Sequence, residues 1–135
     1  MIFLDSWIFL EYFLRGEKAN LAEKVIDNVI RKDRAVTSAT ALLEVKYRIA
    51  KKFGLERAEE AAVTIQNISN LSILPVTVDI AKLAATLRMK YYTPENQLSF
   101  IDTIHLATAV LTNCNRFLTG DKDFIAAEEI KVEII

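Results

Sequence analysis

The sequence predicts one α/β domain over residues 1–135, with a mainly parallel central sheet between two layers of helices (α/β/α). Short apolar runs alternate with longer segments of helical periodicity, which is the pattern of parallel strands joined by helices. Only three glycines and two prolines are present, too few for the frequent turns of a β-sandwich or barrel. Hydrophobic residues make up 52% of the chain, which excludes a disordered protein.

The amino-terminal part is expected to start with a buried strand and to continue in helices. Ile2–Leu4 is wholly apolar and short, as a buried strand is. Trp7–Leu14 is expected to be a helix, with Ser6 as its N-cap and Gly16 beyond its end. Glu17–Lys32 is expected to be a second helix, because its apolar residues fall at helical spacing. These residues are Leu21, Ala22, Val25, Ile26 and Val29.

The central part adds two strands and two helices. Arg34–Thr37 predicts a second short strand. Thr40–Phe53 carries an apolar stripe and is stopped by a glycine, which predicts a helix. Glu56–Ser69 predicts another helix. Leu71–Val76 has β character, and Pro75 within it favours either the edge of the sheet or the end of the strand, because proline donates no ladder hydrogen bond.

The carboxy-terminal part completes the alternation. The expected elements are a helix at Val78–Tyr92, a polar loop at residues 93–97, a helix at Phe100–Leu111, a strand at Asn115–Leu118, a short helix at Lys122–Glu128 and a strand at Lys131–Ile135. The segment from residue 100 to 111 is almost entirely apolar, which indicates a helix buried on most of its surface.

The composition excludes several classes of protein. Cys114 is the only cysteine, so no intrachain disulfide forms, and with His105 as the only histidine no Cys/His zinc site is possible within one chain. The formal net charge is −1, so any contact with nucleic acid needs a local basic patch. The apolar start of the chain carries Asp5 and Glu11 and no positive leader, so we expect a cytoplasmic protein without membrane contact.

Four acidic residues stand where ionised carboxylates are costly. Asp5 and Asp121 follow predicted strands, whereas Glu44 and Asp102 lie inside apolar helical segments. No lysine or arginine lies within four residues of Asp5 or Asp102. A buried carboxylate needs a hydrogen bond or a positive partner. A metal ion would provide that charge, and an all-oxygen ligand set favours Mg²⁺ or Mn²⁺ over zinc.

Each acid also has a purely structural explanation. Asp5 and Asp121 stand where helix N-caps are expected. Ser99 and Asp102 have the spacing of a capping box. Glu44 is near two basic residues and is compatible with a solvent-exposed position. Spacing alone does not show whether the four carboxylates converge.

The segments around these acids resemble those of one family. Residues 1–13 (MIFLDSWIFLEYF) look like the opening of PIN domains, and residues 37–44 (TSATALLE) look like their second acidic segment. Residues 100–109 (FIDTIHLATA) and 117–124 (FLTGDKDF) are similar to the third and fourth. The order matches along the whole chain. Within this family the chain most resembles the small VapC-like toxins of bacterial and archaeal toxin–antitoxin pairs, which are metal-dependent ribonucleases.

The resemblance implies a site and a reaction. Asp5, Glu44, Asp102 and Asp121 fall on the four acidic positions, and the first, third and fourth of these are expected to hold one or two Mg²⁺ or Mn²⁺ ions. Glu44 is expected either to ligate an ion or to act as general base. Supporting positions are Ser6, Thr119 and Asp123. The implied reaction is hydrolysis of an RNA phosphodiester bond by a metal-activated water.

Three other residues near the motifs are open to interpretation. Trp7 stands where the family often has Asn, which predicts either an altered site or, more simply, a core tryptophan. His105 is one helical turn after Asp102, and a packing or supporting role is expected for it. Cys114 is expected to be a small buried apolar residue.

Partners follow from the same resemblance. An RNA substrate, an antitoxin protein and a second copy of the chain in a homodimer are expected. The first two helices were expected to offer exposed apolar surface for these contacts through Trp7, Phe9, Phe13 and Leu14. The basic residues considered for the RNA backbone are Arg15, Lys46, Arg48, Arg116 and Lys122.

Two other classes of function were weighed. A PIN-fold module that binds RNA or protein with little or no catalysis has Trp7 in its favour and the complete set of acids against it. An aspartyl-phosphate domain needs a different arrangement: a haloacid-dehalogenase-like phosphatase requires a second aspartate at position 7, which is tryptophan, and a receiver domain requires its acids on earlier strands.

Overall fold

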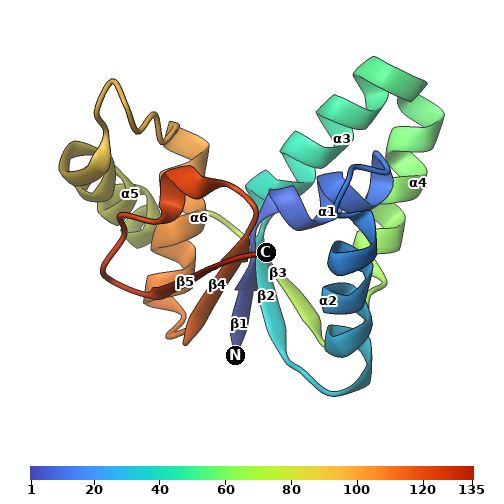
Figure 1. Cartoon of the computed structure of the whole chain (residues 1–135), viewed down its shortest axis with the longest axis horizontal. Coiled ribbons are helices and arrows are strands. Elements are labelled where there is room, and N and C mark those ends of the chain that lie inside the picture. The colour runs from blue at the N-terminus through green and yellow to red at the C-terminus, as the bar shows by residue number, and fades with distance from the viewer.

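The computed structural model describes residues 1–135 and contains one five-stranded sheet (Figure 1). All neighbouring strands are parallel, in the order β3-β2-β1-β4-β5. The strands are β1 (Ile2–Leu4), β2 (Ala35–Ser38), β3 (Leu71–Leu74), β4 (Arg116–Thr119) and β5 (Lys131–Ile134). The predicted parallel α/β sheet is confirmed, and β3 takes the edge position that its neighbouring proline favours.

Helices cover both faces of this sheet. They are α1 (Ser6–Phe13), α2 (Ala19–Arg31), α3 (Ala39–Phe53), α4 (Leu55–Gln66), α5 (Val78–Tyr91), α6 (Phe100–Leu111) and the 3₁₀ turn η1 (Lys122–Phe124). Figure 1 shows α1–α4 on one side and α5 and α6 on the other. None of these helices combines the length and apolarity needed to cross a bilayer.

Two hydrophobic cores follow from the pleat of the strands. Leu4 and Leu118 point into the core beneath α1–α4, while Phe3 and Phe117 point into the core beneath α5 and α6. Successive side chains of a strand face opposite sides. Because both sides are covered, the central strand β1 is wholly apolar, as the sequence indicated. The Phe3 and Phe117 rings stack with their centroids 5.0 Å apart.

One predicted element is wrong. The helix expected at Lys122–Glu128 is only the 3₁₀ turn Lys122–Phe124. The backbone N–H of Glu128 donates to the Tyr91 hydroxyl at 2.9 Å instead of continuing a helical ladder. The Phe124 side chain is fully buried in the second core, which holds the turn against the sheet. The other elements form where they were expected, with ends shifted by a few residues.

The buried face of the first helices also differs from the expected one. Helix α2 buries Ala22, Ile26 and Val29, whereas Leu21 is 44% exposed. The expectation that Phe9 offers exposed surface is wrong, because its side chain is fully buried in the first core. The remaining members of that set are partly buried and pack against the same core: Trp7, Phe13 and Leu14.

Candidate active site

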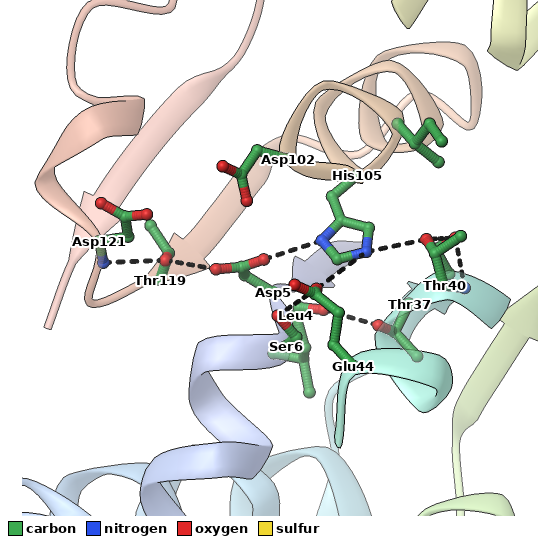
Figure 2. A network of polar contacts seen from close by, with 12 residues as sticks. Leu4, Asp5, Ser6, Thr37, Thr40, Glu44, Asp102, His105, Thr119 and Asp121 are labelled. Carbon is green, nitrogen blue, oxygen red and sulfur yellow. Dashed lines mark hydrogen bonds and ion pairs between the residues drawn. The ribbon is translucent and has the colours of Figure 1, made fainter. Parts of the chain in front are cut away.

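The four acids gather at the carboxyl ends of the central strands. Asp5 directly follows β1, and Asp121 follows β4, its neighbour in the sheet. The chain order reverses between these two strands, which is where open parallel sheets bind their ligands. The amino-terminal parts of α3 and α6 bring Glu44 and Asp102 to the same place (Figure 2).

Asp5 is the buried centre of the site, with 3% of its surface exposed. His105 Nδ1 lies 3.0 Å from Asp5 Oδ1. The Thr119 hydroxyl donates to Asp5 Oδ2 at 2.7 Å and accepts from the Asp121 backbone N–H at 3.0 Å. Both oxygens of Asp5 are therefore anchored, one to α6 and one to β4.

Glu44 reaches the site from α3. The Ser6 hydroxyl at the start of α1 donates to Glu44 Oε1 at 2.8 Å, and His105 Nε2 lies 3.8 Å from the same oxygen. About a quarter of the Glu44 side chain, 26%, is exposed to solvent.

Asp102 has two roles at once. The Ser99 hydroxyl accepts from the Asp102 backbone N–H at 3.0 Å, and Asp102 Oδ2 accepts from the Ser99 N–H at 2.9 Å. The capping box indicated by the spacing is therefore present. Burial, together with the negative charges of Asp5 and Glu44, raises the pKa of Asp102 to about 6 despite the Ser99 bonds.

Asp121 is also both a cap and a member of the cluster. Its Oδ1 accepts from the backbone N–H of Asp123 at 2.9 Å and so caps η1. Burial raises the pKa of Asp121, and the charges of Asp123 and Asp5 act in the same direction. The structural explanation holds for Asp102 and Asp121, while Asp5 makes no side-chain cap to α1.

The donor set fits a divalent cation. None of the four acids forms an ion pair with lysine or arginine. Asp102 and Asp121 each use one oxygen in a cap and keep the other free. The side chains do not stand in ligating geometry, since no group of three or more acids, histidines or cysteines is close enough to enclose an ion. Oxygen ligands of this kind suit Mg²⁺ or Mn²⁺.

Trp7 packs beside the site rather than within the core alone. A Cβ atom at Gly120 would collide with the Trp7 indole, so the ring lies directly on the backbone between Thr119 and Asp121. Trp7 therefore supports the turn that carries Asp121. The indole of Trp7 thus packs on the backbone, whereas the Asn that the family often has at this position would present a polar group.

The structure brings only some of the candidate RNA-binding residues near the acids. Lys122 directly follows Asp121, and Arg48 lies one turn after Glu44 on α3; both are exposed. Lys46 is paired with Glu59 at 2.7 Å. Arg116 begins β4, at the opposite end of the sheet from the acids, and pairs with Glu133 at 3.1 Å. Arg15 follows the far end of α1.

Thr40 is the residue of the site that sequence reasoning missed. Its hydroxyl lies 2.9 Å from His105 Nε2 and 2.7 Å from the Ser38 hydroxyl. Ser38 caps α3 by accepting from the Thr40 backbone N–H. In the sequence, two hydroxyl residues at the start of a helix, such as Ser38 and Thr40, indicate capping alone. The contact with a histidine 65 residues away has no local signal.

The fold and the group of acids define an α/β domain of the kind that binds ligands at the carboxyl edge of its sheet. The model of the PIN domain family matches residues 2–130, and the chain belongs to this family. No curated protein sequence matches the chain.

Solved structures with the same fold are toxins of toxin–antitoxin systems. VapC20 of Mycobacterium tuberculosis, described as a sarcin–ricin-loop-cleaving toxin, is 20% identical, with a TM-score of 0.78 over 97% of this chain and 99% of that one. VapBC2 of Rickettsia felis, bound to a promoter DNA fragment, is 16% identical, with a TM-score of 0.78 over 99% and 98%. VapBC-1 of nontypeable Haemophilus influenzae is 18% identical, with a TM-score of 0.74 over 99% and 98%. The likeness extends over the whole of each chain.

Proposed function

We propose that the protein is a metal-dependent endoribonuclease and the toxin of a toxin–antitoxin pair. The observation that carries the proposal is the group of four acids at the switch point of a parallel sheet, none of which pairs with a lysine or arginine. Burial and neighbouring acids raise the pKa of Asp102 and of Asp121, so a cation bound between these carboxylates would favour their ionised form. Membership of the PIN family and the likeness to VapC20 support the same conclusion.

We assign different roles to the four acids: three would ligate metal, and the fourth would accept a proton. Asp5, Asp102 and Asp121 would hold one or two Mg²⁺ or Mn²⁺ ions. When bound, such an ion polarises a water and offsets the charge of the scissile phosphate. Glu44, held by the Ser6 hydroxyl, accepts a proton from the attacking water. The water oxygen bonds to phosphorus as the bond to the ribose 3′ oxygen breaks. The released 3′ oxygen takes a proton from solvent, which leaves a 5′-phosphate and a 3′-hydroxyl.

Basic residues on both sides of the cleft would hold the RNA backbone. Lys122 stands on the β4 side and Arg48 on the α3 side, and neither has an acidic partner within ion-pair distance. Phosphate contacts of this kind give affinity without sequence preference. We therefore expect single-stranded or looped RNA as substrate, because its backbone and bases are accessible.

Protein partners would use apolar surface that the fold leaves open. Helices α3 and α4 expose Leu43, Tyr47 and Leu55 by 58%, 61% and 73%. Helices α5 and α6 expose Met89 and Phe100 by 87% and 66%. Exposed apolar side chains in groups mark protein contacts. An antitoxin and a second copy of the chain are the proposed occupants, and the cytoplasm is the proposed location.

RNA cleavage with mapped product ends tests this proposal. Purified protein with Mg²⁺ or Mn²⁺ is expected to cut looped RNA to products with 5′-phosphate ends, and excess chelator is expected to stop the reaction. Asp5→Asn serves as the inactive control. Cleavage that survives the chelator, or products with a 2′,3′-cyclic phosphate, would contradict the mechanism. Binding of RNA without cleavage would favour a binding module.

A further inference from the structure

We propose that His105 is a positioning residue that orients Asp5 toward a bound metal through its Nδ1 atom. The inference rests on the proposed function, since it concerns the same acidic site. His105 is fully buried, and its ring joins β1, α3 and α6, which are the elements next to Asp5, Glu44 and Asp102.

The contacts of the ring determine where its proton lies. Asp5 is an acceptor, so Nδ1 carries the hydrogen of the 3.0 Å contact with Oδ1. With the neutral ring, Nε2 accepts from the Thr40 hydroxyl at 2.9 Å, and Thr40 in turn accepts from Ser38 at 2.7 Å. Thr119 donates to the other oxygen of Asp5 at 2.7 Å. Donors from two sides therefore converge on one carboxylate.

This arrangement fixes the plane of the Asp5 carboxylate. One donor to each oxygen holds the carboxylate between Thr119 and His105, and Figure 2 shows the Asp102 and Asp121 side chains near it. Histidine or carboxylate ligands held by such bonds bind metals more tightly than free ones. The hydrogen bond of His105 is to Asp5, and its Nε2 lies 3.8 Å from Glu44 Oε1, so the proposed effect on a metal acts through Asp5.

A packing role alone does not account for the residue. The His105 ring does pack on Phe3, with centroids 5.9 Å apart, and an apolar ring would serve there equally well. The site instead contains a buried polar ring with both nitrogens satisfied, and no buried side-chain nitrogen or oxygen of the protein lacks a partner. Burying such a ring is favourable only with both bonds formed.

Two matched variants separate the two nitrogens. In His105→Asn the side-chain amide stands near the place of Nδ1 and keeps the bond to Asp5. In His105→Gln the longer amide stands near the place of Nε2 and keeps the bond to Thr40. Mn²⁺ binding is measured by electron paramagnetic resonance on folded protein. We expect the Asn variant to bind within about threefold of wild type and the Gln variant to bind about 10–100-fold more weakly.

The outcomes distinguish this inference from the proposed function. Equal Mn²⁺ affinity in both folded variants, with wild type binding the ion, overturns the positioning role and leaves the proposed function standing. A wild-type protein that neither binds Mn²⁺ nor cleaves RNA overturns both. Should neither variant fold, wild type labelled with ¹⁵N-histidine decides, because His105 is the only histidine. Mg²⁺ is expected to shift its Nδ1 resonance, and an unchanged resonance overturns the inference.

Discussion

Asp5 and Asp102 reach the same cleft by different means. The partners of Asp5 are His105 and Thr119, 100 and 114 residues away in sequence. The partner of Asp102 is Ser99, three residues away. Asp5 is almost completely buried, whereas Asp102 lies partly open to solvent in the first turn of α6. One carboxylate depends on the whole fold and the other on a single helical turn.

This difference predicts different costs for removing the two side chains. Deleting Asp5 leaves the His105 and Thr119 donors buried without an acceptor. Deleting Asp102 removes a carboxylate whose charge is unfavourable in the metal-free protein, because burial and the Asp5 and Glu44 charges raise its pKa to about 6. The first change destabilises the fold, and the second mainly removes a metal ligand.

The largest effect is expected at Asp5. Asp5→Ala should lower the free energy of unfolding by about 2–4 kcal/mol, because two buried donors lose their acceptor at about 1–3 kcal/mol each. Urea unfolding at pH 7 in chelator measures this. Asp5→Asn is the control: its amide fills the same volume, and the ring tautomer of His105 adapts, so most of the stability should return while RNA cleavage stays absent.

The next largest effect is expected to be the stabilisation of the fold by bound Mn²⁺. It further distinguishes Asp102 from Asp5. Mn²⁺ at about 100 times its dissociation constant should stabilise the wild type by about 2.7 kcal/mol. For a domain of this size the melting temperature should rise by roughly 8–12 °C. Asp102→Asn keeps an acceptor for the Ser99 N–H and should be at least as stable without metal, yet lose most of the shift.

Thermal melts of both proteins, with Mn²⁺ and with chelator, check this expectation. An unchanged metal shift in Asp102→Asn would mean that Asp102 only caps α6. Loss of the shift together with loss of RNA cleavage would establish it as a ligand, in addition to its capping role.

The same contrast explains which parts of the fold could be predicted. The strand Ile2–Leu4 and the helix Phe100–Leu111 were predicted correctly, because wholly apolar runs of those lengths have few alternatives in a parallel sheet. The helix expected after Asp121 was wrong, because its end depends on the hydroxyl of Tyr91, which lies 37 residues before Glu128 in the chain. Local patterns determine the elements, and distant contacts determine where some of them stop.

The candidate site likewise has residues that local patterns predict and contacts that depend on distant parts of the chain. Ser99 and Asp102 could be paired from sequence, because a capping box is a local motif. The four acids could be chosen as candidates from their apolar surroundings and their family resemblance. The Asp5–His105–Thr40 contacts had no such signal, because each joins a different element of the fold. The catalytic roles themselves stay predictions.

A pH dependence of moderate size should distinguish Asp102 from its amide. The pKa of Asp102 is about 6 in the folded protein against an ordinary value of 3.8. A raised pKa means that the folded protein holds the proton more tightly, so this contribution to stability is complete below about pH 4 and is lost as pH rises through about 6.

The difference between about 6 and 3.8 corresponds to at most about 3 kcal/mol, and partial exposure to water reduces it to about 1–2 kcal/mol. The measurement is the free energy of unfolding of metal-free wild type minus that of Asp102→Asn, between pH 4 and 7.5. The difference should decrease by that amount as pH rises. A difference that is constant with pH contradicts the burial of charge at this position.

The smallest effect is expected at Ser99, and it tests whether the local cap matters to the site. Ser99→Ala removes the acceptor of the Asp102 backbone N–H, and loss of such a cap costs about 1 kcal/mol. The N–H of residue 99 still donates to Asp102 Oδ2, so the carboxylate keeps its orientation and RNA cleavage should stay within about threefold of wild type.

The matched change at Asp5 is Thr119→Val, which keeps the shape of the side chain but removes the donor to Asp5. That variant should reduce cleavage by about 10–100-fold. Equal losses of cleavage in the two variants would show that the local cap orients its carboxylate as strictly as the fold orients Asp5, and the distinction drawn between the two aspartates would be wrong.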